Sequence, residues 1–143
     1  MICGRICQTA ALRLRSVKGF IMGKKILVVD DAAFMRKLIR ETLISGGHTD
    51  IVEAEDGYTA CDKYFAERPD LVIMDITMPN MSGIEALHDI REKDPEAKVI
   101  MCSAMGQESM VVEAIKIGAL DFIVKPFKPE LLISAVEKIF EAE

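Results

Sequence analysis

The segment Asp70–Pro79 constrains the fold more strongly than any other part of the chain. An apolar run, Leu71–Met74, ends at the carboxylate of Asp75, and a loop that contains Pro79 follows. A short apolar run with β-branched residues and no interruption indicates a strand buried on both faces, as in a parallel sheet covered by helices. Asp75 would then lie at the carboxyl end of that strand, where open α/β sheets place their ligand sites.

Strand and helix patterns alternate along the rest of the chain, with short connections and no internal repeat. Ser82 and Glu85 form a capping box at the start of one helical stretch. The expected strands cover residues 26–29, 51–54, 71–75, 99–102 and 122–124, and the expected helices cover 32–45, 57–67, 82–93, 108–117 and 129–141. This order predicts a single α/β domain: a doubly wound, flavodoxin-like, five-stranded parallel sheet with strand order 2-1-3-4-5 and five helices.

Composition narrows the classes of partner. The 143 residues suit one domain with a proper core, and a net charge of -5 gives no general attraction for nucleic acid or anionic lipid. No apolar run approaches the roughly 20 residues that span a bilayer. Cys61 and Cys102 fall in apolar periodic segments, so we expect buried thiols and a cytoplasmic location. A protein partner or a cation is favoured over nucleic acid or a membrane.

The first 21 residues differ from the rest. They contain four of the 18 basic residues and no acid, which leaves 14 basic against 23 acidic residues, a net charge of -9, in the remainder. Because Met22 resembles a natural start, we divide the chain into an N-terminal extension, residues 1–21, and a domain, residues 22–143. An upstream extension, a targeting peptide and a membrane or partner anchor are the alternatives for residues 1–21. We favour a disordered tail with no role in the chemistry.

Polar side chains are expected at the carboxyl ends of four strands. Asp30 and Asp31 follow the first strand, Asp75 ends the third, Ser103 follows the fourth and Lys125 follows the fifth. Each has an ordinary explanation on its own, as a helix cap, a turn residue or a solvated charge. All carboxyl ends of a parallel sheet share one edge, however, and these side chains together on one edge indicate a site.

The charges of these side chains indicate the chemistry. Three carboxylates brought close together repel one another unless they take up protons or a cation lies between them. An all-oxygen ligand set without His or Cys suits Mg²⁺. With the Lys125 ammonium and the Ser103 hydroxyl nearby, the edge can accommodate a phosphoryl group, for which Asp75 is the best nucleophile.

Four motifs resemble the receiver domain of two-component response regulators. The motifs are Ile26–Asp31 with its Asp pair, Met74–Pro79 followed by Gly83, Cys102–Ala104, and Val124–Phe127. Their combination is highly specific, and the resemblance covers residues 23–142. Ala32–Arg36 and Ser103–Gln107 are further similar to the stand-alone, CheY-like receivers of chemotaxis.

The resemblance implies roles for the site residues. Asp75 would accept a phosphoryl group from a histidine kinase of the CheA type. Asp31, Asp75 and the backbone carbonyl of Thr77 would hold Mg²⁺, with Asp30 acting through water. Lys125 would bond a phosphoryl oxygen, and its peptide bond to the following proline would be cis.

A conformational switch is also implied. Ser103 would bond a second phosphoryl oxygen, and its movement would vacate space for Phe122, the switch residue. This population shift would alter the surface of the last two helices and the last strand. The expected output residues are Met110, Val111, Ile115, Phe122 and Ile123, with packing of the helix onto the sheet as the favoured role of Val111 and Ile115.

The implied protein is a cytoplasmic monomer that catalyses only its own phosphorylation and dephosphorylation. Its partners would be the kinase, the flagellar switch or another protein effector, and a phosphatase. The first alternative is a receiver in a different phosphorelay. A Mg²⁺-dependent phosphohydrolase with an Asp nucleophile is a second, although it would carry an acid where Thr77 stands. A flavin-binding carrier and a scaffold with a degenerate site are the others.

Overall fold

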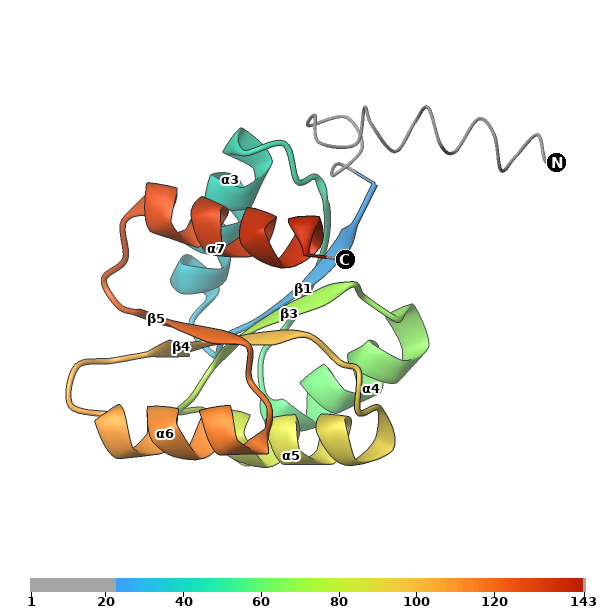
Figure 1. Cartoon of the computed structure of the whole chain (residues 1–143), viewed down its shortest axis with the longest axis vertical. Coiled ribbons are helices and arrows are strands. Elements are labelled where there is room, and N and C mark those ends of the chain that lie inside the picture. Colours follow the sequence, from blue (N-terminus) through green and yellow to red (C-terminus); the bar gives the residue numbers. More distant parts are fainter. Residues whose placement is uncertain (1–22, 143) are drawn as a thin grey trace, which may run out of the picture.

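The computed structural model describes residues 23–142, and the predictions for residues 1–21 lie outside this part of the chain. The described part alternates strands and helices throughout (Figure 1). The elements are β1 (Lys25–Val29), α3 (Ala33–Ser45), β2 (Asp50–Ala54), α4 (Gly57–Glu67), β3 (Leu71–Asp75), α5 (Gly83–Lys93), β4 (Val99–Ser103), α6 (Glu108–Ile117), β5 (Asp121–Val124) and α7 (Pro129–Glu141).

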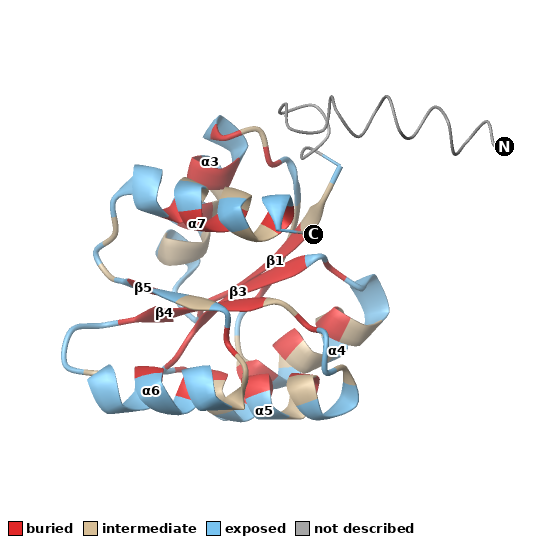
Figure 2. Ribbon diagram, in the orientation of Figure 1, coloured by how far each residue is buried: buried red, intermediate tan, exposed pale blue. Residues whose placement is uncertain are grey.

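Within residues 23–142 the five strands form one parallel sheet in the order β2-β1-β3-β4-β5, which confirms the predicted fold class. Helices α3 and α7 cover one face, and α4, α5 and α6 cover the other (Figure 1). All five residues of β3 are buried, as the apolar run predicted (Figure 2). The central strand therefore delivers Asp75 to the middle of the carboxyl edge.

Two apolar cores lie on opposite faces of the sheet because successive strand residues point to opposite sides. On one face, Ile26 and Ile73 pack with α3 and α7, including Leu43 and Val136. On the other face, the core joins strand residues to the inner sides of α4, α5 and α6, with members such as Leu27, Met74, Ala60, Leu87 and Ala114. The two cores therefore pack the sheet between its two layers of helices.

Several element boundaries extend beyond the apolar runs. Strand β1 begins at Lys25, β2 at Asp50 and β5 at Asp121, and β4 continues to Ser103. Backbone pairing explains these extensions, since Lys25 pairs with Asp50 and Ser103 pairs with Val124. The predicted capping box at the start of α5 is present.

Two further expectations concern burial and membranes. Cys102 is buried as expected, whereas Cys61 is only partly buried, because it lies on a helix at the margin of its core. Within residues 23–142, no helix combines the length and the apolar character needed to cross a membrane.

Candidate functional site

Asp75 is held by the backbone at the junction of β3 and α5. The N–H of Ile76 donates to the carbonyl of Cys102 at 3.0 Å, and the N–H of Gly83 donates to the carbonyl of Ile76 at 2.7 Å. The chain therefore returns to the end of β3 when α5 begins. This closed loop leaves the Asp75 side chain 10% exposed at the edge of the sheet.

The acid pair after β1 completes a carboxylate cluster. Asp30 is buried, and its side chain accepts the N–H of Ala32 at 2.9 Å, which holds the turn into α3. Asp31 is exposed. One carboxylate oxygen from each of Asp30, Asp31 and Asp75 lies within 4.8 Å of the others. The three acids that the sequence placed on one edge are thus brought together.

Lys125 bridges two of the three acids. Its Nζ donates to Asp30 Oδ2 at 2.9 Å and lies 3.2 Å from Asp75 Oδ1. The Lys125–Pro126 bond is cis, as expected. Burial by itself lowers the pKa of Lys125, but the hydrogen bond to Asp30 and the charge of Asp75 outweigh it and leave the pKa raised. Lys125 therefore carries its positive charge at neutral pH.

The charge balance of the cluster suits a hard cation. Burial raises the pKa of Asp75 above its usual value, Lys125 opposes this shift, and the nearby charges of Asp30 and Asp31 add to it. One lysine does not offset three carboxylates, so a cation among them would relieve the remaining repulsion. The donor set is carboxylate oxygen throughout, which is the chemistry that Mg²⁺ prefers. The residues present therefore fit this ion.

We expect Asp75→Asn to raise the melting temperature in Mg²⁺-free buffer at neutral pH. A raised pKa means that folded Asp75 holds its proton more tightly than the unfolded chain does. The folded state therefore loses stability as the pH rises from the pKa of an ordinary carboxyl group, about 4, through the raised pKa of Asp75. The uncharged amide of the variant does not titrate, so it avoids this loss. Calorimetry should show a gain near pH 7 that disappears below about pH 4. Asp62→Asn, on the exposed side of α4, should show no gain; an unchanged or lower melting temperature for Asp75→Asn would contradict the expectation.

The remaining predicted residues surround this cluster. Ser103 is buried at the end of β4, and its carbonyl accepts the N–H of Lys125 at 2.7 Å. Thr77 is exposed in the loop after β3. Phe122 on β5 is 44% exposed, and it lines a cavity of about 550 Å³ together with Ser103.

Two expectations about the output surface are wrong. Ile123 is 7% exposed because alternate residues of β5 face opposite sides, and Ile123 faces the core beneath α7. Ile115, expected to pack α6 onto the sheet, is 44% exposed and lines the cavity beside Phe122. Val111 is buried as expected, and Met110 is exposed.

A supporting ion-pair network was not predicted from the sequence. Arg36 on α3 donates from Nη1 to the backbone carbonyl of Asp30 at 2.6 Å, and its Nε lies 3.1 Å from Glu53 on β2. Arg40 pairs with the other oxygen of Glu53 at 3.1 Å. Helical spacing places Arg36 and Arg40 on one side of α3, but nothing in the sequence alone points one of them at the Asp30 carbonyl.

The fold and the residues at the carboxyl edge of the sheet together define a class of protein. It is a doubly wound α/β domain whose carboxyl edge carries three clustered acids and a lysine, an arrangement suited to a metal ion and a phosphoryl group. Residues 26–137 match the family model described as the response regulator receiver domain.

Relatives and solved structures agree with this match. The chain is 52% identical over 118 residues to the chemotaxis protein CheY of Thermotoga maritima, covering 82% of this chain and 98% of that protein. It is 54% identical over 117 residues to CheY of Bacillus subtilis, with the same coverage. The solved receiver domain of NtrX from Brucella abortus superposes with a TM-score of 0.78 at 37% identity, covering 82% of this chain and 99% of that chain.

This chain therefore belongs to the response regulator receiver domain family. Its domain is CheY-like, because it aligns with nearly the whole length of several CheY proteins. Membership of this family separates it from the phosphohydrolases and flavin carriers considered from the sequence.

Proposed function

We propose that Asp75 accepts a phosphoryl group from a phosphohistidine of a histidine kinase. The observation that carries this proposal is the position of Asp75 Oδ1, 3.2 Å from Lys125 Nζ and grouped with Asp30 and Asp31 at the open edge of the sheet. A carboxylate oxygen of Asp75 forms a bond to phosphorus while the phosphorus–nitrogen bond to the donor imidazole breaks. The products are an acyl phosphate on Asp75 and an unphosphorylated histidine.

Asp31, Asp75 and the backbone carbonyl of Thr77 would hold Mg²⁺, with Asp30 acting through water. When bound, the ion neutralises phosphoryl oxygens as charge develops on them. The pairing of Lys125 with Asp75 supports a role for its ammonium as the donor to a second phosphoryl oxygen. The Ser103 hydroxyl would supply a third contact from the end of β4.

Phosphorylation would reach the surface through Ser103 and Phe122. Both residues line the same cavity, and the half-exposed ring of Phe122 has space in which to turn as Ser103 moves toward the phosphoryl group. The phosphoryl group would then shift the population between two packings of α6, β5 and α7. Exposed Met110 and Ile115 would lie on the surface that changes.

The relatives named chemotaxis protein CheY support a role in chemotaxis. In this proposal the domain is a cytoplasmic monomer that receives phosphate from a CheA-like kinase, controls the flagellar switch and is reset by its own dephosphorylation and by a phosphatase. It catalyses no reaction on a separate substrate. Residues 1–21 would form an extension with no part in this chemistry, and residues 22–143 the domain.

The proposal is tested by incubating the protein with acetyl phosphate and Mg²⁺. Mass spectrometry at neutral pH should detect one added phosphoryl group, and chelation of the metal should prevent the addition. With beryllofluoride, an unreactive mimic of the phosphoryl group, NMR shifts are expected around Ser103 and Phe122. Failure to label the protein at millimolar Mg²⁺ would contradict the proposed function.

We expect Arg36→Met to weaken Mg²⁺ binding by about tenfold, the lower end of the effect of removing a partner that orients a ligand. Arg36 donates to the carbonyl of Asp30 and so positions the acid pair. Arg40→Met is the matched control, because it loses the same charge and the same kind of pair with Glu53 without a contact to Asp30. NMR titration with Mg²⁺ measures both. Equal affinities of the two variants would exclude a positioning effect.

A further inference from the structure

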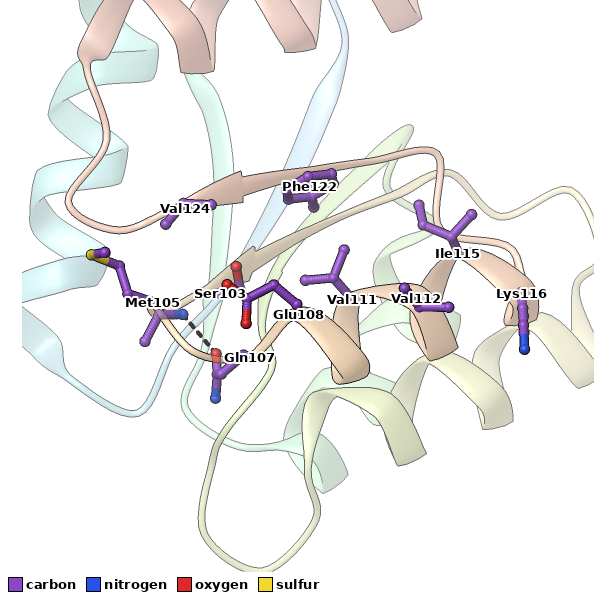
Figure 3. Close-up of a pocket in the computed structure, with 11 residues that line it drawn as sticks. Ser103, Met105, Gln107, Glu108, Val111, Val112, Ile115, Lys116, Phe122 and Val124 are labelled. Atoms are coloured by element: carbon purple, nitrogen blue, oxygen red, sulfur yellow. Dashed lines mark hydrogen bonds between the residues drawn. The ribbon is translucent and has the colours of Figure 1, made fainter.

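The side chain of Gln107 joins two loops beside the acid cluster. Its Nε2 donates to Thr77 Oγ1 at 2.6 Å. Its Oε1 accepts the N–H of Ala104 at 2.6 Å, and Figure 3 shows this second bond as a dashed line at Gln107. Thr77 lies two residues after Asp75, and Ala104 directly follows Ser103. One amide therefore ties the loop between β4 and α6 to the loop between β3 and α5.

Local backbone geometry makes this bridge. Gly106 has a φ of +90°, a conformation that side-chain-bearing residues rarely adopt, and a Cβ added there would meet nothing within 4 Å. The turn lets the Gln107 side chain fold back on the amide of Ala104, three residues earlier. Although Gln107 is the N-cap residue of α6, its side chain makes no capping bond. Both polar ends of the amide bond to the two loops instead.

We propose that Gln107 is a positioning residue that latches the loop between β4 and α6 in the unphosphorylated arrangement. This inference rests on the proposed function, in which Ser103 moves toward a phosphoryl group on Asp75. Such a movement carries the Ala104 amide with it, while Thr77 stays anchored to the end of β3. At least one of the two hydrogen bonds of Gln107 has to break, so the latch opposes the switch.

The latch also acts on the surface that the switch controls. Gln107, Ser103 and Phe122 line the same cavity, as the close-up shows (Figure 3). Release of the loop that holds Ser103 would therefore loosen one wall of the space beside the Phe122 ring. Gln107 would set how readily phosphorylation is converted into a surface change, without touching the reacting atoms.

Amide hydrogen exchange tests the bridge in the full-length unphosphorylated protein. Exchange at Ala104 should accelerate about tenfold in Gln107→Ala, because its N–H loses a strong acceptor. Glu108→Ala, which changes the next residue on the same cavity wall, is the matched control and should leave Ala104 unchanged. An Ala104 exchange rate that does not respond to Gln107→Ala would overturn the proposal.

A double-mutant cycle with beryllofluoride tests the regulatory role. Gln107→Ala and Thr77→Val should each bind beryllofluoride about fivefold more tightly than the wild-type chain, the change expected for loss of one hydrogen bond that opposes binding. The double variant should bind no more tightly than either single variant, because both remove the same link. Additive effects, or unchanged affinities, would overturn the latch. If the wild-type protein binds no beryllofluoride, the proposed function fails and the regulatory role with it, while the exchange measurement still decides whether the bridge exists.

Discussion

Asp75→Asn is expected to abolish phosphoryl uptake from acetyl phosphate under conditions that label the wild-type domain. The amide keeps the size of the carboxylate at the end of β3 but has no anionic oxygen to attack phosphorus. The variant should keep the fold, because the backbone bonds of the loop after β3 do not involve this side chain. Intact-protein mass spectrometry should therefore find only the unmodified mass.

Two further variants sharpen this result. Asp62→Asn removes an exposed carboxylate from α4, away from the cluster, and should label like the wild type. Asp31→Asn should label poorly at low Mg²⁺ and recover as the Mg²⁺ concentration rises, because it removes a proposed metal ligand and keeps the nucleophile. A phosphoryl group found on Asp75→Asn would move the nucleophile to another residue.

Gly83→Ala is expected to destabilise the domain by about 3 kcal/mol or more, at the upper end of the usual cost of overpacking. A Cβ at Gly83 would overlap the carbonyl oxygen of Asp75 and lie 2.9 Å from its carbonyl carbon. These are backbone atoms of a buried strand, so they cannot move aside without shifting β3 against α5. Urea denaturation, with far-UV circular dichroism as the signal, measures the loss.

Gly46→Ala is the matched control for this prediction. It is the same substitution at a φ of -89°, where the three atoms nearest the added Cβ belong to the side chain of Ile133, at 3.1 to 3.3 Å, and not to the backbone. Its effect should stay within about 1 kcal/mol of the wild type. Similar losses for both variants would mean that the close approach of Gly83 to Asp75 is not the source of the cost. Any folded Gly83→Ala protein should also label poorly, because the displaced strand end carries the nucleophile.

Much of the fold could be predicted from the pattern of residues. Three local signals in the sequence predict it: the apolar run before Asp75, the alternation of strand and helix patterns, and the glycine and proline residues at which helices stop. In a parallel sheet these local signals have a global consequence, since all carboxyl ends meet at one edge. The gathering of Asp30, Asp75 and Lys125 followed from the order of the strands and from where each of them ends.

Other features could not be predicted because they depend on which distant surfaces meet. The apolar residues of β5 look equivalent in the sequence, yet Phe122 is half exposed and Ile123 is buried, because α7 packs over only one side of this edge strand. The bridge from Gln107 to Thr77 spans 30 positions, and it depends on a glycine turn and on the spacing of two loops.

The sequence by itself determined the order of elements, the central strand and the residue types at the carboxyl edge. The reason is that hydrophobic periodicity and the ends of strands are local features of the sequence. Only the tertiary structure decided which charges pair and which loops are tied together. Lys125 contacts Asp30 across 95 positions, and Arg36 contacts the Asp30 carbonyl from a helix. Such contacts depend on how the elements pack, because a hydrogen bond or an ion pair forms only when two groups lie within a few ångströms of each other. The pattern of residue types along the chain does not specify these distances.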